Sequence, residues 1–249
     1  MELVVSTSFE VQQNLAMEEF LFSRCSGEYA FFYVNDPCVV IGSNQVWRNE
    51  VDEVFCQGNQ IPVVRRISGG GAVYHDHGNL NYSFISHKTA DISGTGSDFL
   101  LPVVEALASL GVEALIGKRK DLWLPNGYKI SGTASHVTMN RVLQHGTLLY
   151  DTNIEMLHGT LSPRSSSLTV KGIPSVPSPV MNIERYLSEF SEDNHLNARG
   201  ASAFFKEFIN VIARVLKAEA GFTFGEDAYT KIAAIRADRY DTKSWNLRK

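Results

Sequence analysis

Three consecutive glycines, Gly69 to Gly71, constrain this chain more than any other feature of its sequence. They follow an apolar run, Ile61 to Val64, that ends in Arg65 and Arg66. Glycine has no Cβ, so the backbone here can turn sharply and come close to a ligand. Backbone N–H groups in such a turn suit an anion, and the two arginines add positive charge beside it. A strand that ends in arginine and enters a glycine loop therefore predicts an anionic-ligand site.

The glycine loop matches neither of two common phosphate-binding motifs. No Gly-Lys-Ser/Thr follows, which excludes a P-loop, and the glycines are contiguous, which excludes the spaced dinucleotide fingerprint. A glycine triplet alone is more often a flexible surface turn. The polar residues that follow, His75, Asp76 and Asn79, together with the arginine pair favour a functional loop.

Composition indicates an ordinary globular chain. Its 249 residues are 44% hydrophobic and 20% charged, which is enough apolar material for a substantial core. A net charge of −4 argues against a broad nucleic-acid interface, and no apolar run approaches membrane-spanning length. Cys25, Cys38 and Cys56 form neither a disulfide framework nor a Cys-x-x-Cys metal site. Their odd number fits a reducing compartment, and the N-terminus lacks a signal-peptide pattern, so we expect a cytoplasmic protein.

Hydrophobic spacing predicts a mixture of helices and strands. Helical patterns cover residues 9–24, 97–111, 201–220 and 227–238, and strand patterns cover 30–34, 38–42, 61–64, 80–85, 123–130 and 142–150. Turn signals at residues 35–37 and 125–127 predict two hairpins, the first joining 30–34 to 38–42. Hairpins with intervening helices predict an α+β (mixed α/β) fold on largely antiparallel or mixed sheets flanked by helices. No repeat or linker divides residues 1–249, so we expect a single domain.

Residues 158–181 differ from the rest of the chain. They hold four of its eight prolines and show no periodicity. A segment of this length without periodicity is usually a functional loop or disorder.

Three motifs resemble those of a known family. Residues 65–81, which read RRISGGGAVYHDHGNLN, are similar to the signature of the lipoate–protein ligase A family. Residues 129–134 (KISGTA) and 144–149 (QHGTLL) resemble two further elements of that family, in the family's order. Weaker similarity runs from about Phe9 to Trp245. The resemblance implies a biotin/lipoate ligase-like catalytic domain over residues 1–249, without the family's small C-terminal accessory domain.

The resemblance also implies a reaction. Such a ligase joins lipoate or octanoate to ATP, releases pyrophosphate, and passes the acyl group to a lysine of a partner protein. The implied acceptors are the lipoyl domains of 2-oxoacid dehydrogenase E2 subunits and the glycine-cleavage H protein. Because the first step brings two anions together, positive charge is needed where carboxylate and α-phosphate meet, a role that Mg²⁺ normally shares.

Site residues follow from the matched motifs. Lys129 is the candidate catalytic residue, whose ammonium would touch both carboxylate and phosphate oxygens. The resemblance assigns the acid to Arg66, Ser68, Gly69, Gly70, Ala134, His145 and Gly146. It assigns the nucleotide to Gly71, Ala72, Val73, Tyr74, Asn79, Asp121, Lys129 and Lys171, with Asp121 also a candidate ligand of Mg²⁺.

Each of these residues also has a structural interpretation. Lys129 could be an edge-strand lysine in water, Arg66 a surface salt-bridge partner, and Tyr74 part of a core strand. Asn79 could cap a turn, and Asp121 could pair with Arg119. The family often has Arg-Asn-Asp where this chain has Arg119-Lys120-Asp121, so no asparagine takes that position here.

Two more segments extend the prediction. Residues 171–176 (KGIPSV) resemble the family's Lys-Gly-Ile-x-Ser-Val segment, which implies a loop that closes over the acyl-adenylate and excludes water. His75 and His77 are spaced as a possible metal pair, but two histidines without carboxylates are a weak metal signal.

Three alternative functions stay open at this point. The superfamily contains octanoyl and lipoyl transferases with a cysteine nucleophile, although all three cysteines here precede residue 57, away from the other motifs. The chain could instead accept preformed lipoyl-adenylate, or form one half of a two-chain ligase with a separate accessory polypeptide. A non-catalytic lipoate-binding protein is the third alternative, and an intact Lys129 argues against it.

Overall fold

The structure is a computed structural model that describes residues 1–89, 96–162, 174–190 and 199–248. Lys171 lies outside the described residues. Within these ranges, no helix is both long enough and apolar enough to cross a membrane.

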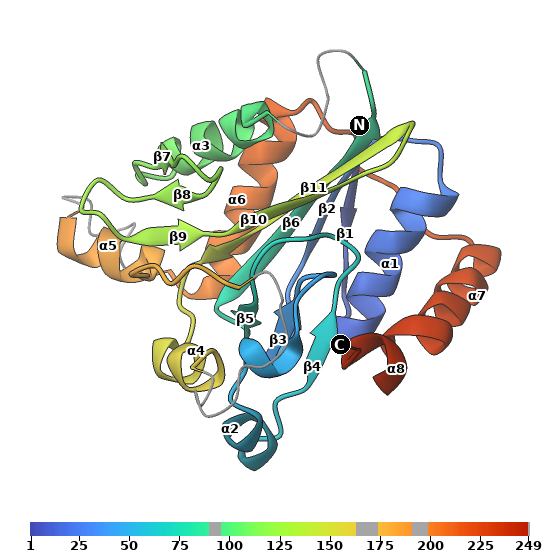
Figure 1. Cartoon of the computed structure of the whole chain (residues 1–249). Helices are drawn as coiled ribbons and strands as arrows, with labels where there is room; N and C mark the ends of the chain where they lie inside the picture. The colour runs from blue at the N-terminus through green and yellow to red at the C-terminus, as the bar shows by residue number, and fades with distance from the viewer. Residues whose placement is uncertain (90–95, 163–173, 191–198, 249) are drawn as a thin grey trace.

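A five-stranded sheet forms the centre of the molecule (Figure 1). Its strands lie in the order β1 (Glu2–Val5), β2 (Tyr29–Tyr33), β6 (Asn79–His87), β11 (Arg141–Leu149) and β10 (Thr133–Val137). Only β1 and β2 run parallel, and every other pair is antiparallel. The long strands β6 and β11 pair over nine residues, which sets the register of the residues that face the site.

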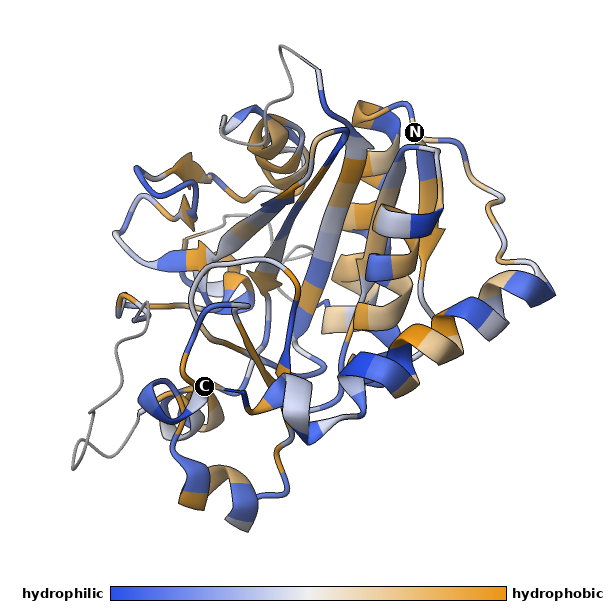
Figure 2. Ribbon diagram, turned by 45° about the vertical axis from the view of Figure 1, so that its right-hand side comes forward, coloured by the Kyte–Doolittle hydropathy of each residue, from blue (hydrophilic) through white to orange (hydrophobic). Residues whose placement is uncertain are grey.

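Helices cover both faces of this sheet. One face packs against α3 (Leu101–Ala108), α5 (Ile183–Phe190) and α6 (Ala201–Val215), and the other against α1 (Val11–Arg24) and α7 (Glu226–Ile235). Phe31 and Phe32 show the alternation, because successive strand residues point to opposite faces: Phe32 packs in the first core and Phe31 in the second. Figure 2 shows the separate hydrophobic and hydrophilic bands on the helices.

Two three-stranded sheets complete the fold. The first contains β4 (Val63–Arg65), β3 (Cys38–Ile41) and β5 (Val73–His75), and it packs near η1 (Trp47–Asn49), α2 (Glu53–Gly58) and α4 (Ile154–Thr160). The second contains β7 (Leu115–Ile116), β8 (Leu122–Trp123) and β9 (Lys129–Ser131). The remaining elements are η2 (Asp98–Leu100), the π-helical η3 (Arg236–Tyr240) and α8 (Lys243–Asn246).

The predicted α+β class is confirmed, and so is the hairpin at residues 125–127, where Gly127 has a φ of +86° between β8 and β9. The other predicted hairpin is wrong. β2 pairs with β1 and β6, whereas β3 pairs with β4 and β5 in a different sheet. The connection at residues 35–37 is exposed only in part: Asp36 and Pro37 are exposed, whereas Asn35 is fully buried and bonded to Asn14 and His75. It carries the chain from one sheet to the next.

Candidate active site

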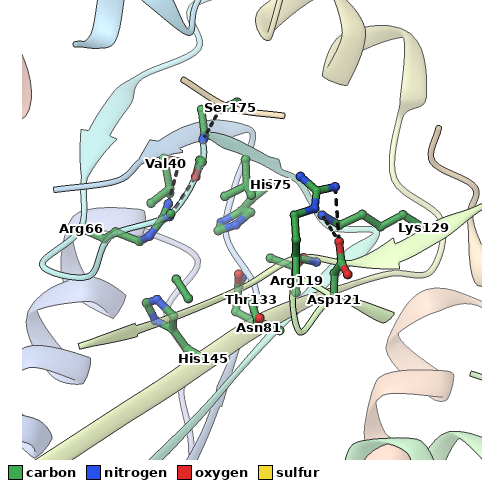
Figure 3. Close-up of a pocket in the computed structure, with 18 of the residues that line it drawn as sticks. Val40, Arg66, His75, Asn81, Arg119, Asp121, Lys129, Thr133, His145 and Ser175 are labelled. Atoms are coloured by element: carbon green, nitrogen blue, oxygen red, sulfur yellow. Dashed lines mark hydrogen bonds and ion pairs between the residues drawn. The ribbon is translucent and has the colours of Figure 1, made fainter. Parts of the chain in front are cut away.

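A cavity of about 330 Å³ lies where the glycine loop, β9 and β10, and the adjoining part of β11 meet (Figure 3). The structure brings most of the predicted site residues to its wall: Arg66, Gly70, Gly71, Ala72, Val73, Asp121, Lys129, Ala134, His145 and Gly146. These residues come from the three motifs and from the segment that holds Asp121, which are separated in the sequence and brought together by the fold.

One end of the cavity is rich in charge. Lys129 Nζ lies 3.2 Å from Asp121 Oδ2, and Arg119 Nη2 lies 3.6 Å from the same oxygen. Burial lowers the pKa of Lys129, an effect that Asp121 partly offsets. Burial by itself would raise the pKa of Asp121, but a hydrogen bond from Trp123 and the charge of Lys129 outweigh it and lower that pKa. Two cations on one carboxylate leave net positive charge that suits an anionic ligand.

The glycine loop is shaped by Arg66. Its guanidinium donates to the carbonyls of Val40 at 3.2 Å, Gly69 at 2.5 Å and Gly71 at 2.8 Å, and its Nε donates to Ser68 Oγ at 2.9 Å. Gly70 has a φ of +85°, and a Cβ there would lie 2.9 Å from Arg66 Nη2. The loop therefore needs glycine at this position for both conformation and space.

Beneath the loop, three buried side chains form a hydrogen-bonded chain. His145 Nε2 lies 2.7 Å from Ser68 Oγ, and His145 Nδ1 lies 3.0 Å from Glu18 Oε1. Because an ionised carboxylate only accepts, Glu18 fixes a proton on Nδ1. Tyr33 and Ser83 also donate to Glu18. Ser68 has no exposed surface and does not line the cavity, so the chain positions the loop and offers no accessible nucleophile.

A strap, residues 174–179, covers the cavity from the glycine loop to β9. Its Ser175 Oγ accepts from the Ala72 amide at 2.9 Å, and the same hydroxyl donates to Glu50 Oε2. At the other end, Arg119 donates to Ser178 Oγ at 3.0 Å, and the Lys129 amide donates to the carbonyl of Pro179 at 2.9 Å. The strap thus contacts both ends of the site.

Part of the cavity wall is apolar. Leu15, Tyr33 and Val40 line it and belong to one hydrophobic cluster. The buried side chains of His75 and Asn81 line the cavity as well.

Several predicted residues lie elsewhere. Ser68, Gly69, Tyr74 and Asn79 are not in the cavity wall. The Tyr74 side chain packs in the core with Val39 and Trp47. Asn79 donates to Asn81 Oδ1 at 3.4 Å. Asn81, and not Asn79 as we expected, lines the cavity wall.

Arg65 also departs from expectation. It was predicted to add charge beside the glycine loop, yet its guanidinium donates to the carbonyls of Gly42, Gln45, Trp245 and Arg248. Successive strand residues point to opposite sides, so only Arg66 faces the cavity.

The histidine pair does not form a metal site. His77 is exposed and lies 2.7 Å from Asp36, whereas His75 is buried. Among the described residues, no group of three or more His, Cys, Asp or Glu side chains could hold a metal ion.

Sequence analysis did not single out four residues that complete the site: Asn81 and Ser175, which lie inside quoted motifs, and Glu18 and Glu50, which do not. Glu18 looks like an ordinary polar position in an amphipathic helix, and Glu50 lies outside every motif. Their burial is the signal, because a carboxylate is almost never buried unless it is paired. Burial is not readable from one sequence.

The three cysteines lie outside the cavity wall. None of the three lines the cavity, and Cys38 and Cys56 are buried. Burial raises the pKa of Cys56 to about 11 and that of Cys38 further still. Thiols that stay protonated are poor nucleophiles.

Comparisons with known proteins agree with this geometry. Lipoate-protein ligase LplJ of Bacillus subtilis is 38% identical over 237 residues, covering 94% of this chain and 69% of that protein. A lipoate-protein ligase A solved with bound ATP superposes with a TM-score of 0.80 at 25% identity, covering 99% of this chain and 98% of the other. A bi-partite lipoate protein ligase of Thermoplasma acidophilum, described with its E2 lipoyl domain, superposes with the same TM-score and identity, covering 99% and 95%.

The fold and the site define a mixed α+β catalytic domain of the biotin/lipoate ligase type. The family model for the lipoyl protein ligase A/B catalytic domain matches residues 10–216. The chain belongs to that family.

Proposed function

We propose that the chain is an ATP-dependent lipoate–protein ligase, which converts lipoate or octanoate to an acyl-adenylate and transfers the acyl group to a protein lysine. One observation carries the proposal: a single cavity is lined both by the cations Lys129 and Arg119 and by the apolar side chains Leu15 and Val40. Such a cavity suits an acid whose carboxylate must meet a nucleotide phosphate while its tail leaves water.

In this proposal Lys129 stabilises the charge that develops as the acid oxygen attacks the α-phosphorus and pyrophosphate leaves. Its ammonium is a compact charge held in place by Asp121 at 3.2 Å, so little reorganisation is needed during the reaction. The backbone from Gly71 to Val73 receives the adenosine. A Cβ at Gly71 would lie 2.9 Å from Ser175 Oγ, so glycine here lets the strap close on the loop. The closed strap would keep water from the mixed anhydride.

Asp121 fits a supporting role for Mg²⁺. It is the carboxylate that lines the described cavity wall, and Mg²⁺ in nucleotide sites is typically held by one or two carboxylates plus substrate phosphates. When bound, the ion would neutralise phosphate charge. Asp121 would then be shared between the ion and Lys129.

Partners follow from the family and the site. We propose that the acceptors are lipoyl domains of 2-oxoacid dehydrogenase E2 subunits and the glycine-cleavage H protein, in line with the E2 lipoyl domain described with the Thermoplasma ligase. Because that ligase is bi-partite, we include a separate accessory polypeptide among the proposed partners of this chain. The three cysteines of the chain studied here are free, in keeping with the cytoplasmic location predicted from the sequence.

The test is lipoate-dependent ATP–pyrophosphate exchange by the purified chain, without any acceptor. Exchange would establish acyl-adenylate formation by this chain alone. No exchange, with lipoylation of an acceptor from synthetic lipoyl-adenylate, would make the chain a transferase or one half of a two-chain ligase. If the chain showed neither activity but still bound lipoate, its function would be that of a non-catalytic lipoate-binding protein.

A further inference from the structure

The outer side of β1 presents backbone groups to an open edge. β1 is an edge strand of the central sheet and pairs with β2 on one side (Figure 1). The amides of Glu2 and Ser6 donate to carbonyls on the β2 side, at 2.7 and 2.9 Å. Successive residues of a strand direct their backbone groups to opposite sides, so those of Leu3 and Val5 point away from β2.

The first part of this edge is already paired. The Leu3 amide donates to the carbonyl of Glu219 at 2.8 Å, and the Glu219 amide donates to the carbonyl of Met1 at 3.0 Å, which makes a one-residue parallel bridge. Among the described residues, no backbone hydrogen bond reaches the Leu3 carbonyl or the Val5 amide, which come next along the edge. Unpaired groups of this kind are a template on which another extended segment can add as a strand.

The open part of the edge borders an apolar cleft. The cleft has a volume of about 560 Å³ and lies between β1 and α6. Leu3 and Val5 line it from β1, and the buried rings of Phe32 and Phe205 line it from the first core. Val5 is 50% exposed, and Phe9, at the same cleft, is 52% exposed. Large apolar side chains that gather at a cleft and stay half in water indicate a binding surface.

The α6 side of the cleft carries a positive charge. Ser202, Lys206 and Asn210 line the cleft at a spacing of four residues, so they form one polar row on the helix. In the part of α6 that holds this row, Glu207 pairs with Arg199, and no ion pair among the described residues engages Lys206. An unpaired ammonium at the rim favours a negatively charged group on the occupant of the cleft.

We propose that the groove formed by β1 and α6 binds an extended segment of a partner protein. The segment adds as a strand beside β1 and forms hydrogen bonds with the Leu3 carbonyl and the Val5 amide. Every second side chain of the segment then faces the cleft, so an apolar side chain fills it and an acidic one meets Lys206. The partner is thus recognised by an extended sequence that combines apolar and acidic residues.

This groove is separate from the chemistry of the candidate active site. Val5 and Lys206 line the cleft and not the active-site cavity, although Tyr33 borders both. The inference therefore does not rest on the proposed ligase function. Substitutions at these two positions should leave ATP–pyrophosphate exchange unchanged, and a wild-type chain without exchange activity would still bind the segment.

Two substitutions each remove one feature of the groove. Val5→Pro deletes the outward N–H, and proline is tolerated on an edge strand where the N–H faces outward. Its control, Val5→Ala, shortens the side chain but keeps the N–H. Lys206→Glu reverses the charge at the rim, and its control is Lys231→Glu, at an exposed lysine on α7. Thermal unfolding shows whether each variant is folded.

The probe is a phage-displayed library of linear heptapeptides, selected on the purified wild-type chain. We expect enriched sequences with alternate apolar residues and an aspartate or glutamate. Fluorescence anisotropy with a synthetic copy of the most enriched peptide should show Kd raised about three- to tenfold by Val5→Pro and by Lys206→Glu, because each loses one hydrogen bond or ion pair. Both control variants should bind within about twofold of wild type.

Several results would overturn the inference. Selection might enrich no such sequence, or the selected peptide could bind equally well to Val5→Pro, which would exclude strand addition. Self-association of the wild type in sedimentation velocity that Val5→Pro abolishes would make the occupant a second copy of this chain. If Val5→Pro does not fold, hydrogen exchange of the wild type decides: bound peptide should slow exchange of the Val5 amide, and unchanged exchange would exclude pairing at this edge.

Discussion

Glu18 on α1 and His145 on β11 form a buried pair beneath the glycine loop, with 3.0 Å between Oε1 and Nδ1. The carboxylate is 1% exposed. Through His145 Nε2 the pair reaches Ser68, and through Ser68 it reaches Arg66, which holds the loop. One carboxylate in a helix thus determines the position of a loop some fifty residues later in the chain.

Glu18→Gln should destabilise the protein by about 2–4 kcal/mol at pH 7, because it leaves buried donors without their charged acceptor. Burial by itself raises the pKa of Glu18, but His145, Ser83 and Tyr33 together lower it below its ordinary 4.5. A lowered carboxyl pKa stabilises the fold fully above the ordinary value, and that stability is lost as the pH falls through the folded-state pKa.

The difference between wild type and Glu18→Gln should therefore shrink on acidification below about pH 4.5. Urea unfolding at several pH values measures it, with the exposed Glu105→Gln as control. A difference that stays constant down to pH 3 would contradict the role given to the Glu18 charge.

The fold class, the main elements and the motif residues could be predicted from the sequence. The α+β class, the main helices and the strands β6 and β11 follow from periodicity, since their apolar residues repeat at helix or strand spacing. Residues carried by a motif, such as Lys129 and the glycine loop, were found because the pattern is local.

Long-range relationships could not be found in this way. Asn35 looked like the start of a turn, yet its burial between Asn14 and His75 sends the chain into a second sheet. Arg65 and Arg66 are adjacent and chemically identical, and the alternation of the extended backbone where β4 ends decides which one faces the cavity. Such outcomes depend on which surfaces pack together.

Ser175→Ala should weaken the strap. The hydroxyl of Ser175 links the Ala72 amide to the buried carboxylate of Glu50, and alanine can make neither contact. Without an acceptor protein, we expect about three- to tenfold faster release of AMP, because water would reach the anhydride more often. AMP release under single turnover measures the effect, and Ser188→Ala, exposed on α5, is the control. Slower release than in wild type would show that the strap hinders formation of the adenylate rather than protecting it.

Arg65→Lys should cost about 2–4 kcal/mol of stability. The guanidinium is fully buried and donates to carbonyls of residues 42–45 and of the C-terminal segment. The backbone carbonyl of Arg65 accepts from the Trp245 indole at 2.8 Å. A lysine cannot reproduce this fork of donors and leaves several buried carbonyls unpaired.

Urea unfolding measures the loss for Arg65→Lys. The control is Arg48→Lys, whose exposed ion pair with Glu53 at 3.5 Å should matter by less than about 1 kcal/mol. Equal midpoints for the two variants would mean that the C-terminal segment is not held through Arg65.

Lys129→Ala should lower lipoate-dependent ATP–pyrophosphate exchange at least about a hundredfold, because the cation that neutralises the two reacting anions is gone. The matched control is Lys231→Ala, an exposed lysine on α7 that also pairs with an aspartate, Asp227, at 2.6 Å. Both variants lose one charge and one ion pair, so a difference between them reports the position of Lys129 in the cavity. Exchange within about threefold of wild type would remove Lys129 from the proposed mechanism. A hundredfold loss together with normal transfer from synthetic lipoyl-adenylate would place its role in the activation step alone.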